Sequence, residues 1–302
     1  MKRILIADPL AKEGVEELKS FGIFEVVEKT DISQEDLCQE IGQYNAVVVR
    51  SRTKIYKETL ENPGNLELIV RGGVGTDNID KCTAKEKNIV VKNTPLASSI
   101  SVAELVIGMA LAGMRGLVDA TVSTKKGLWE KKKFKGLELY GKTLGIIGLG
   151  NIGKETAKRA VALGMKVIAY DPVVTMCAIE GVVLTTLDKV NIDADIISVN
   201  CPKTDCTSHL IDSAFLSKMK DGAAIINCSR GGIVVEQDLV DALRSGKISF
   251  AGIDVYEKEP AKENPLFAMD NVILTPHIGA QTKEGQTRVG VEVASVIHDF
   301  FK

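Results

Sequence analysis

The chain has 302 residues, of which 45% are hydrophobic and 26% are charged, and its formal net charge is −2. This size and composition are enough for a substantial buried core and suggest two domains better than one. The basic residues are scattered apart from the run at 125–135, "KKGLWEKKKFK", which indicates a solvated face. A nucleic-acid-binding surface is therefore not expected.

The cysteines and the N-terminus indicate a cytoplasmic protein. None of the six cysteines forms a C-x-x-C pair, so neither a metal site nor a disulfide is expected. The first apolar run, "RILIAD", is too short for a signal peptide, and no window reaches the roughly 18 apolar residues of a membrane helix. We expect a reducing compartment and no membrane partner.

Short apolar runs alternate with helical patterns over the first third of the chain. Helices are predicted at 11–22 and 33–43 from their amphipathic spacing. Strands are predicted at 3–8, 24–29, 45–51, 66–73 and 88–95. Near-continuous apolar strands alternating with helices predict a parallel sheet covered on both faces.

A long apolar segment at 98–118 interrupts this alternation. It is predicted to be the longest helix, and Ser101 and Glu104 have the spacing of a capping box at its start. The alternation then resumes, with strands predicted at 142–150, 166–171, 195–200, 222–229, 250–255 and 271–276. The sequence thus predicts two doubly wound α/β domains, residues 1–95 and 96–279, with a final helix at 285–301 that completes the first domain.

The second block contains a dinucleotide-binding fingerprint. In "LGIIGLGNIGKE", Gly148, Gly150 and Gly153 form G-x-G-x-x-G between a strand and a helix, with Asn151 and Ile152 inside the motif. Such glycines bring backbone N–H groups and a helix N-terminus to a pyrophosphate. Asp171, at the end of the next strand, is expected to bind the adenosine ribose. Since its carboxylate would repel a 2′-phosphate and no arginine follows, NAD is predicted over NADP.

Three residues that follow predicted strands of the second block suggest a catalytic site. Arg230, Glu259 and His277 would meet at the carboxyl ends of the strands. An arginine fork can hold a carboxylate, a histidine can exchange a hydroxyl proton, and a carboxylate behind it fixes its tautomer. Each has a structural alternative: a surface arginine, a cap before Pro260 and a histidine that closes a strand. His209 and His298, which have no evident partner in the sequence, are expected to be structural.

The segments "GLGNIG", "NCSRGGIVVE", "DVYEKEP" and "TPHIGAQT" occur in the order and spacing of the D-isomer-specific 2-hydroxyacid dehydrogenases, and the resemblance covers essentially the whole chain. It implies that Arg230 binds the substrate, that His277 is the general acid/base and that Glu259 is its partner. It also implies a homodimer formed through the 98–118 region, with Trp129 reaching the partner's cleft. Further cofactor contacts are implied at Pro202, Thr207, Cys228, Asp254 and Gly279.

Further matches, "VRSRTK", "VRGGVGTDNID" and "GLWEKKKF", resemble the branch of this family that oxidises 3-phospho-D-glycerate. Arg50 and Arg71 would complement a phosphate, Lys131 would add a positive charge from the partner subunit, and backbone N–H groups near Gly73 and Val74 would hold the substrate carboxylate. A hydroxypyruvate, glyoxylate or D-lactate type reductase is the alternative enzyme. An NAD-sensing interaction protein, similar to the C-terminal-binding-protein corepressors, is the alternative from another class.

Two departures from the family pattern carry expectations. Val235 stands where an aspartate is common, which removes an expected helix cap. The sequence ends at Lys302, without the C-terminal regulatory module of many relatives in that branch, so feedback by serine through such a module is expected to be absent.

Overall fold

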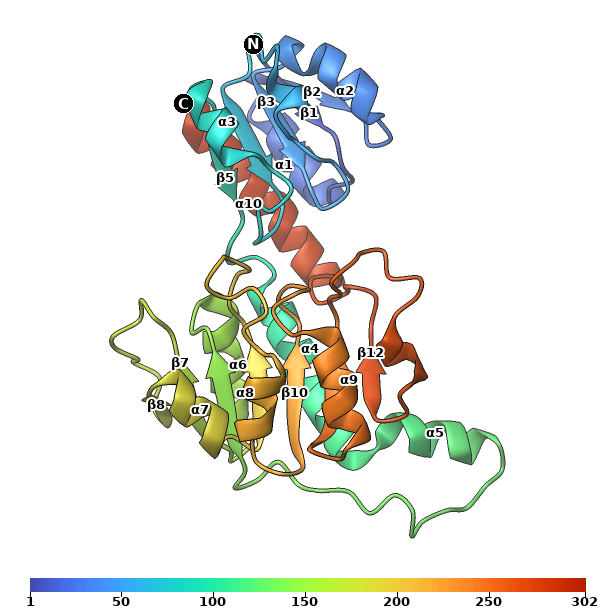
Figure 1. Ribbon diagram of the computed structural model, residues 1–302. Helices are drawn as coiled ribbons and strands as arrows, with labels where there is room; N and C mark the ends of the chain where they lie inside the picture. Colours follow the sequence, from blue (N-terminus) through green and yellow to red (C-terminus); the bar gives the residue numbers. More distant parts are fainter. The chain divides into compact units, whose positions relative to one another are not determined.

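The computed structural model describes residues 1–302, and the chain divides into two compact units (Figure 1). Unit 1 comprises Met1–Ser98 and Ala280–Lys302, and unit 2 comprises Ser99–Gly279. The sequence analysis placed the domain boundaries after residues 95 and 279; in the structure the chain passes from one unit to the other after Ser98 and after Gly279. Each unit is an α/β domain with a parallel sheet, so the predicted fold class is confirmed.

Unit 1 is built on a five-stranded parallel sheet in the order β2-β1-β3-β4-β5. All five strands were predicted from their short apolar runs; the runs of β1, β3 and β4 are mostly buried, whereas the edge strands β2 and β5 are largely half-exposed. The strands are β1 (Lys2–Ile6), β2 (Phe24–Glu28), β3 (Ala46–Val49), β4 (Leu68–Arg71) and β5 (Val90–Asn93).

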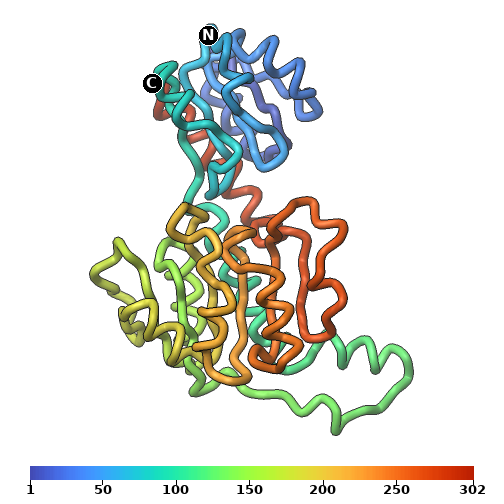
Figure 2. Tube along the Cα trace, viewed as in Figure 1, coloured from blue at the N-terminus to red at the C-terminus, as the bar shows by residue number.

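Helices cover both faces of this sheet. They are α1 (Lys12–Ser20), α2 (Gln34–Glu40), α3 (Lys81–Glu86) and α10 (Lys283–Phe301), with 3-10 turns η1 (Ile41–Gln43) and η2 (Glu58–Leu60). Helix α10 returns from the far end of the sequence and lies beside α1, as the chain trace in Figure 2 shows. The two helices meet at Gly14 and Gly290, where a Cβ on Gly14 would come within 2.3 Å of the Gly290 backbone.

Unit 2 contains a seven-stranded parallel sheet in the order β12-β11-β10-β9-β6-β7-β8. The sequence predicted six of its strands and missed β8, since three residues on a half-exposed edge give no clear apolar run. The strands are β6 (Thr143–Ile147), β7 (Lys166–Tyr170), β8 (Val182–Leu184), β9 (Ile196–Val199), β10 (Ala223–Asn227), β11 (Ile248–Ile253) and β12 (Val272–Leu274).

The segment at 98–118 is not one helix. It forms α4 (Ser99–Arg115) and, after Gly116 at a left-handed φ of 57°, α5 (Leu117–Lys125). The predicted capping box is wrong, because α4 begins two residues before Ser101, and Glu104 pairs with Arg159 at 3.2 Å. Nor is α4 the longest helix, since α10 has 19 residues against 17.

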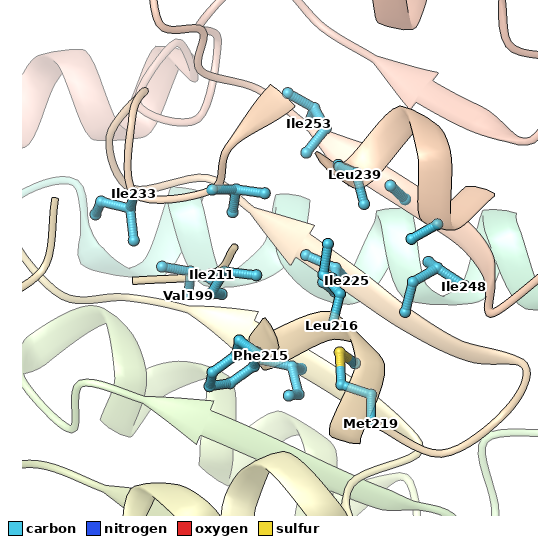
Figure 3. Packing of buried hydrophobic residues seen from close by; sticks show 14 of the residues in the cluster. Val199, Ile211, Phe215, Leu216, Met219, Ile225, Ile233, Leu239, Ile248 and Ile253 are labelled. Carbon is cyan, nitrogen blue, oxygen red and sulfur yellow. The ribbon is translucent and has the colours of Figure 1, made fainter. Parts of the chain in front are cut away.

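The core of unit 2 has two layers, one on each face of the sheet. Helices α4 and α6 (Asn151–Ala162) cover one face, where they bury side chains such as Val106 and Ala157. Helices α7 (Leu187–Asp193), α8 (Ser213–Lys218) and α9 (Glu236–Arg244) cover the other, and η3 (Pro265–Ala268) packs beside them. Figure 3 shows this second layer, in which Phe215, Leu216 and Leu239 pack on strand residues such as Ile225.

Helix α9 is capped from a distance. Val235 occupies its N-cap position and offers no side-chain acceptor, as expected. Instead, the Glu257 carboxylate accepts from the N–H of Glu236 at 3.0 Å, and Glu236 in turn accepts from the N–H of Glu257 at 2.8 Å. This reciprocal pair replaces the missing local cap.

No single helix has the length and hydropathy needed to cross a membrane. Helices α4 and α5 pass that test only when taken together, and they are bent by 62°.

Candidate active site

The glycine-rich loop lies between β6 and α6, as the motif predicts. Gly148 adopts a φ of 95°, and a Cβ on Gly153 would come within 2.2 Å of the Gly148 carbonyl oxygen. Gly150 caps α6 and has open space where its Cβ would lie, while Asn151 and Ile152 begin the helix. The loop therefore leaves a helix N-terminus open to an anion such as a pyrophosphate.

Asp171 follows β7 and is bound to this loop. Its carboxylate accepts from the N–H of Leu149 at 2.8 Å, Val173 at 2.9 Å and Val174 at 3.1 Å. Burial raises the pKa of Asp171, but these three hydrogen bonds outweigh it and the pKa is lowered. The group is thus a fixed negative charge, and a carboxylate that accepts three bonds still has capacity for a ribose hydroxyl.

The side chains of Thr207 and Cys228, two of the expected cofactor residues after β9 and β10, contact other parts of the protein. The Thr207 hydroxyl donates to the Pro202 carbonyl at 2.6 Å and accepts from the N–H of Thr204 at 2.8 Å, which fixes the loop after β9. The Cys228 thiol lies 3.7 Å from the sulfur of Met109 on α4, and burial raises its pKa. Cofactor contacts at these positions stay predictions.

His277 and Glu259 are brought together although 18 residues separate them. The His277 Nδ1 lies 2.7 Å from the Glu259 Oε2, and the other carboxylate oxygen accepts from the N–H of Tyr256 at 3.1 Å. Burial raises the pKa of Glu259, but the bonds and charges of His277, the Tyr256 N–H and Arg230 together lower it. The arrangement leaves the Nε2 of His277 as the nitrogen that can exchange a proton with a ligand.

Arg230 follows β10, the strand next to β11 in the sheet. Its guanidinium donates to the Ser229 carbonyl at 2.7 Å, and its own carbonyl accepts from Asn227 at 3.0 Å. Arg230 also lowers the pKa of Glu259 through its charge. Arg230, Glu259 and His277 therefore occupy the carboxyl ends of three consecutive strands, β10, β11 and β12.

Asp254 holds the segment that carries His277. Its carboxylate, 1% exposed, accepts from the Thr275 hydroxyl at 2.6 Å and from the N–H groups of Ile278 at 2.7 Å and Gly279 at 2.8 Å. The sequence predicted Asp254 and Gly279 as cofactor contacts, and the structure adds this anchoring between them. His277 has a left-handed φ of 54°, uncommon for a residue other than glycine.

The two arginines of unit 1 lie at the ends of neighbouring strands. The Arg50 side chain donates to Gln286 of α10, and burial lowers its pKa. The Arg71 side chain donates to the Ser51 hydroxyl at 3.1 Å and to the Gly72 carbonyl at 3.3 Å. Gly73 has a φ of 145°, and the Val74 carbonyl accepts from Asn93 at 2.6 Å.

Sequence reasoning missed the buried carboxylate that shapes this part of unit 1. Asp8, 1% exposed, accepts from the Arg52 guanidinium at 2.9 Å and from the Thr53 hydroxyl at 2.8 Å, as well as from the N–H of Arg50. Its place two residues after β1 was the available signal, because polar residues at the ends of parallel strands gather at one edge.

The remaining candidates lie elsewhere. Lys131 is exposed and Trp129 is 87% exposed in the segment after α5. That segment extends from the end of the sheet of unit 2 opposite the arrowhead of β10 (Figure 1), whereas Arg230 follows the carboxyl end of β10. His298 stacks on Phe21 at 4.1 Å and the N–H of His209 donates to the Gly232 carbonyl at 2.8 Å, both consistent with structural roles.

Unit 2 thus combines a Rossmann sheet, a glycine loop with a fixed acid beside it, and a histidine–carboxylate pair at the strand ends. These features define a dinucleotide-binding domain of the dehydrogenase type. The open space at Gly150 and the fixed charge of Asp171 fit NAD.

Comparison with known proteins agrees with this class. Residues 107–279 match the family described as "D-isomer specific 2-hydroxyacid dehydrogenase, NAD binding domain". The chain is 46% identical to D-3-phosphoglycerate dehydrogenase of Methanocaldococcus jannaschii over 98% of its own length, but spans only 57% of that relative. It is 47% identical to hydroxypyruvate reductase of Thermotoga maritima, over 98% of this chain and 97% of the relative.

The solved structures agree as well. A D-lactate dehydrogenase from Aquifex aeolicus, complexed with NAD and lactic acid, superposes with a TM-score of 0.85 at 31% identity, covering 99% of this chain and 95% of that one. The chain belongs to the D-isomer specific 2-hydroxyacid dehydrogenases, and residues 107–279 form its NAD-binding domain.

Proposed function

We propose that the protein oxidises 3-phospho-D-glycerate to 3-phosphohydroxypyruvate with NAD, the reaction that opens serine synthesis. The observation that carries the proposal is the 2.7 Å contact between His277 and Glu259 at the strand ends of the NAD-binding domain. Relatives named D-3-phosphoglycerate dehydrogenase, at 46% and 45% identity, support this choice of substrate.

His277 moves the proton in this proposal. In the oxidation, its Nε2 takes the proton of the substrate hydroxyl, and the imidazolium that forms is stabilised by the Glu259 carboxylate on Nδ1. The glycine loop and Asp171 would hold NAD, which would supply the hydride acceptor for the carbon that carries this hydroxyl. In the reverse reaction, the imidazolium returns the proton to the carbonyl oxygen. Glu259 keeps the Nδ1–H tautomer that leaves Nε2 free for this exchange.

In this proposal Arg230 binds the substrate carboxylate, which 3-phospho-D-glycerate shares with the simpler 2-hydroxy acids. Its planar fork can hold the carboxylate in two parallel bonds, which aligns the carbon that loses the hydride. The contact between its guanidinium and the Ser229 carbonyl limits the directions in which the fork can point. Backbone N–H groups at Gly73 and Val74 provide a second cradle for the carboxylate.

We propose that positively charged residues of unit 1 bind the phosphate of the substrate. Arg50 and Arg71 follow or end the paired strands β3 and β4, and each is fixed by a side chain of its own unit, Gln286 and Ser51 respectively. Two anchored guanidinium groups complement a dianion that a plain 2-hydroxy acid does not carry. We assign Lys131 of a partner subunit as a third positive charge.

A panel of 2-oxo acids tests the assignment. Consumption of NADH is measured with phosphohydroxypyruvate, hydroxypyruvate, glyoxylate and pyruvate. We expect phosphohydroxypyruvate to be preferred over hydroxypyruvate by roughly 100-fold in kcat/KM, the effect of a few charge-assisted bonds. Arg71→Ala should remove most of that preference while hydroxypyruvate turnover changes little. Arg244→Ala, at an exposed position on α9, is the matched control and should change neither.

Hydroxypyruvate reduction is the second candidate, because the hydroxypyruvate reductase relative matches this chain over 97% of its own length. Equal kcat/KM for phosphohydroxypyruvate and hydroxypyruvate would reject the phosphoglycerate assignment and select this reductase. NADH binding without turnover of any 2-oxo acid would instead favour the NAD-sensing interaction protein.

A further inference from the structure

Tyr256 contacts both sides of the histidine–carboxylate pair. It lies three residues beyond β11, and its side chain is 7% exposed. Its main-chain N–H donates to Glu259 Oε1 at 3.1 Å, and its phenol donates to the Thr275 carbonyl at 2.9 Å. No role for this side chain follows from the sequence motif alone, since the phenol's partner is 19 residues away.

These contacts close a ring of hydrogen bonds. The Thr275 carbonyl that accepts the phenol also accepts the main-chain N–H of His277 at 3.1 Å. His277 then contacts Glu259 through its imidazole at 2.7 Å, and Glu259 returns to the N–H of Tyr256. The ring of hydrogen bonds therefore links Tyr256, Glu259, His277 and Thr275, and it uses main-chain groups as well as side chains.

The ring restrains a residue in an unfavourable conformation. His277 has a φ of 54°, a region that costs a side chain other than glycine free energy and persists only where surrounding contacts impose it. Asp254 fixes the following residues, Ile278 and Gly279, through their N–H groups. The phenol of Tyr256 fixes the preceding carbonyl at Thr275. His277 is thus held on both sides.

We propose that Tyr256 is a positioning residue, which fixes the His277–Glu259 pair through its main-chain N–H and its phenol. The inference rests on the proposed function, in which His277 exchanges the substrate proton. Burial first, and then the charges of Asp254, Glu236 and Glu259, raise the pKa of Tyr256 to about 12, so the phenol stays a donor at any working pH. A phenylalanine would keep the aromatic side chain and its edge contact with Phe267, but the Thr275 carbonyl would lose the phenol as a donor.

Tyr256→Phe tests the proposal with the full-length protein. We expect kcat to fall about 3- to 10-fold, the effect of one lost hydrogen bond on a proton-transfer geometry, while the Kd for NADH is unchanged. In a His277→Asn background, the same substitution should cause no further loss, because Tyr256 acts through His277. An equal loss in both backgrounds would overturn the proposal.

An NMR measurement decides the question independently of turnover. The chain has only three histidines, so their ring signals can be assigned by single substitutions. Tyr256→Phe should move the His277 signals and leave those of His209 and His298 in place. Unchanged His277 signals would reject the proposal. If the wild type turns over no 2-oxo acid, the proposed function fails, but this experiment still tests the positioning.

Tyr44→Phe is the matched control. Tyr44 is 1% exposed and its phenol interacts with Lys29; it belongs to unit 1, whereas the histidine–carboxylate pair belongs to unit 2. The control loses a buried phenol as well, so it shows the effect on stability alone. It should leave both kcat and the His277 signals unchanged.

Discussion

At the scale of single residues, Asp171 combines a structural and a selective role. Its carboxylate is fixed by three N–H groups of the glycine loop and the following turn, so it cannot swing away from a ligand. A fixed negative charge repels the 2′-phosphate that distinguishes NADP from NAD.

We therefore predict that kcat/KM with NAD exceeds that with NADP at least about tenfold, a difference of about 1.4 kcal/mol. Asp171→Asn, which keeps an acceptor for the loop but removes the charge, should bring the ratio close to one. Asp188→Asn, at an exposed position of α7, should leave it unchanged. Comparable kcat/KM values for the two cofactors in the wild type would contradict the prediction.

Glu259 makes the stability of unit 2 depend on pH. Its pKa is lowered from 4.5, so its contribution to folding is fully present above pH 4.5 and is lost as pH falls through the folded-state value. We predict that Glu259→Gln is less stable than the wild type near neutral pH and that the difference shrinks in acid. Denaturant unfolding at a series of pH values measures this. A difference that stays constant below pH 4.5 would argue against it.

At the scale of elements, α9 shows how a missing local signal is replaced. Its N-cap residue, Val235, has no acceptor, and Glu257 supplies one from the segment after β11. We predict that Glu257→Ala destabilises the protein by about 1 kcal/mol, the usual cost of a lost cap. Val235→Asp should restore that stability in the Glu257→Ala background. Urea unfolding measures the free energy of unfolding of each variant. A Glu257→Ala variant as stable as the wild type would show that the distant cap contributes nothing.

At the scale of the whole molecule, α5 and the segment after it expose apolar side chains. Leu117, Val118, Val122 and Leu128 are each about half exposed, and Trp129 is 87% exposed. Several exposed apolar side chains within 13 consecutive residues are typical of a subunit interface. We therefore expect that two copies of the chain associate through this segment.

Sedimentation and fluorescence test that expectation. The protein should sediment at twice the mass of one chain, and Val118→Asp should reduce this to one. Because Trp129 is the only tryptophan, its emission should shift to longer wavelength when the dimer dissociates on dilution. A single-chain mass at every concentration, with unchanged emission, would exclude a dimer through this surface.

The amino-acid sequence alone was enough to predict both parallel sheets, apart from the edge strand β8, and the position of the glycine loop. Apolar runs buried on both faces and glycines needed for close approach leave signals within a few consecutive residues. It also indicated that Arg230, Glu259 and His277 would lie together, since residues that follow parallel strands share one edge. Their roles in binding and proton transfer stay predictions, as do the substrate and the dimer.

Features that depend on contacts between distant segments became visible only in the folded chain. The helix break at Gly116, the cap from Glu257, the buried Asp8 and the ring through Tyr256 were not predicted. In each case the partners are far apart in the sequence or the competing local patterns are equally favourable. A propensity or a period describes neighbours along the chain, whereas the Thr275 carbonyl meets the phenol of Tyr256, 19 residues away, only when β11 and β12 pair.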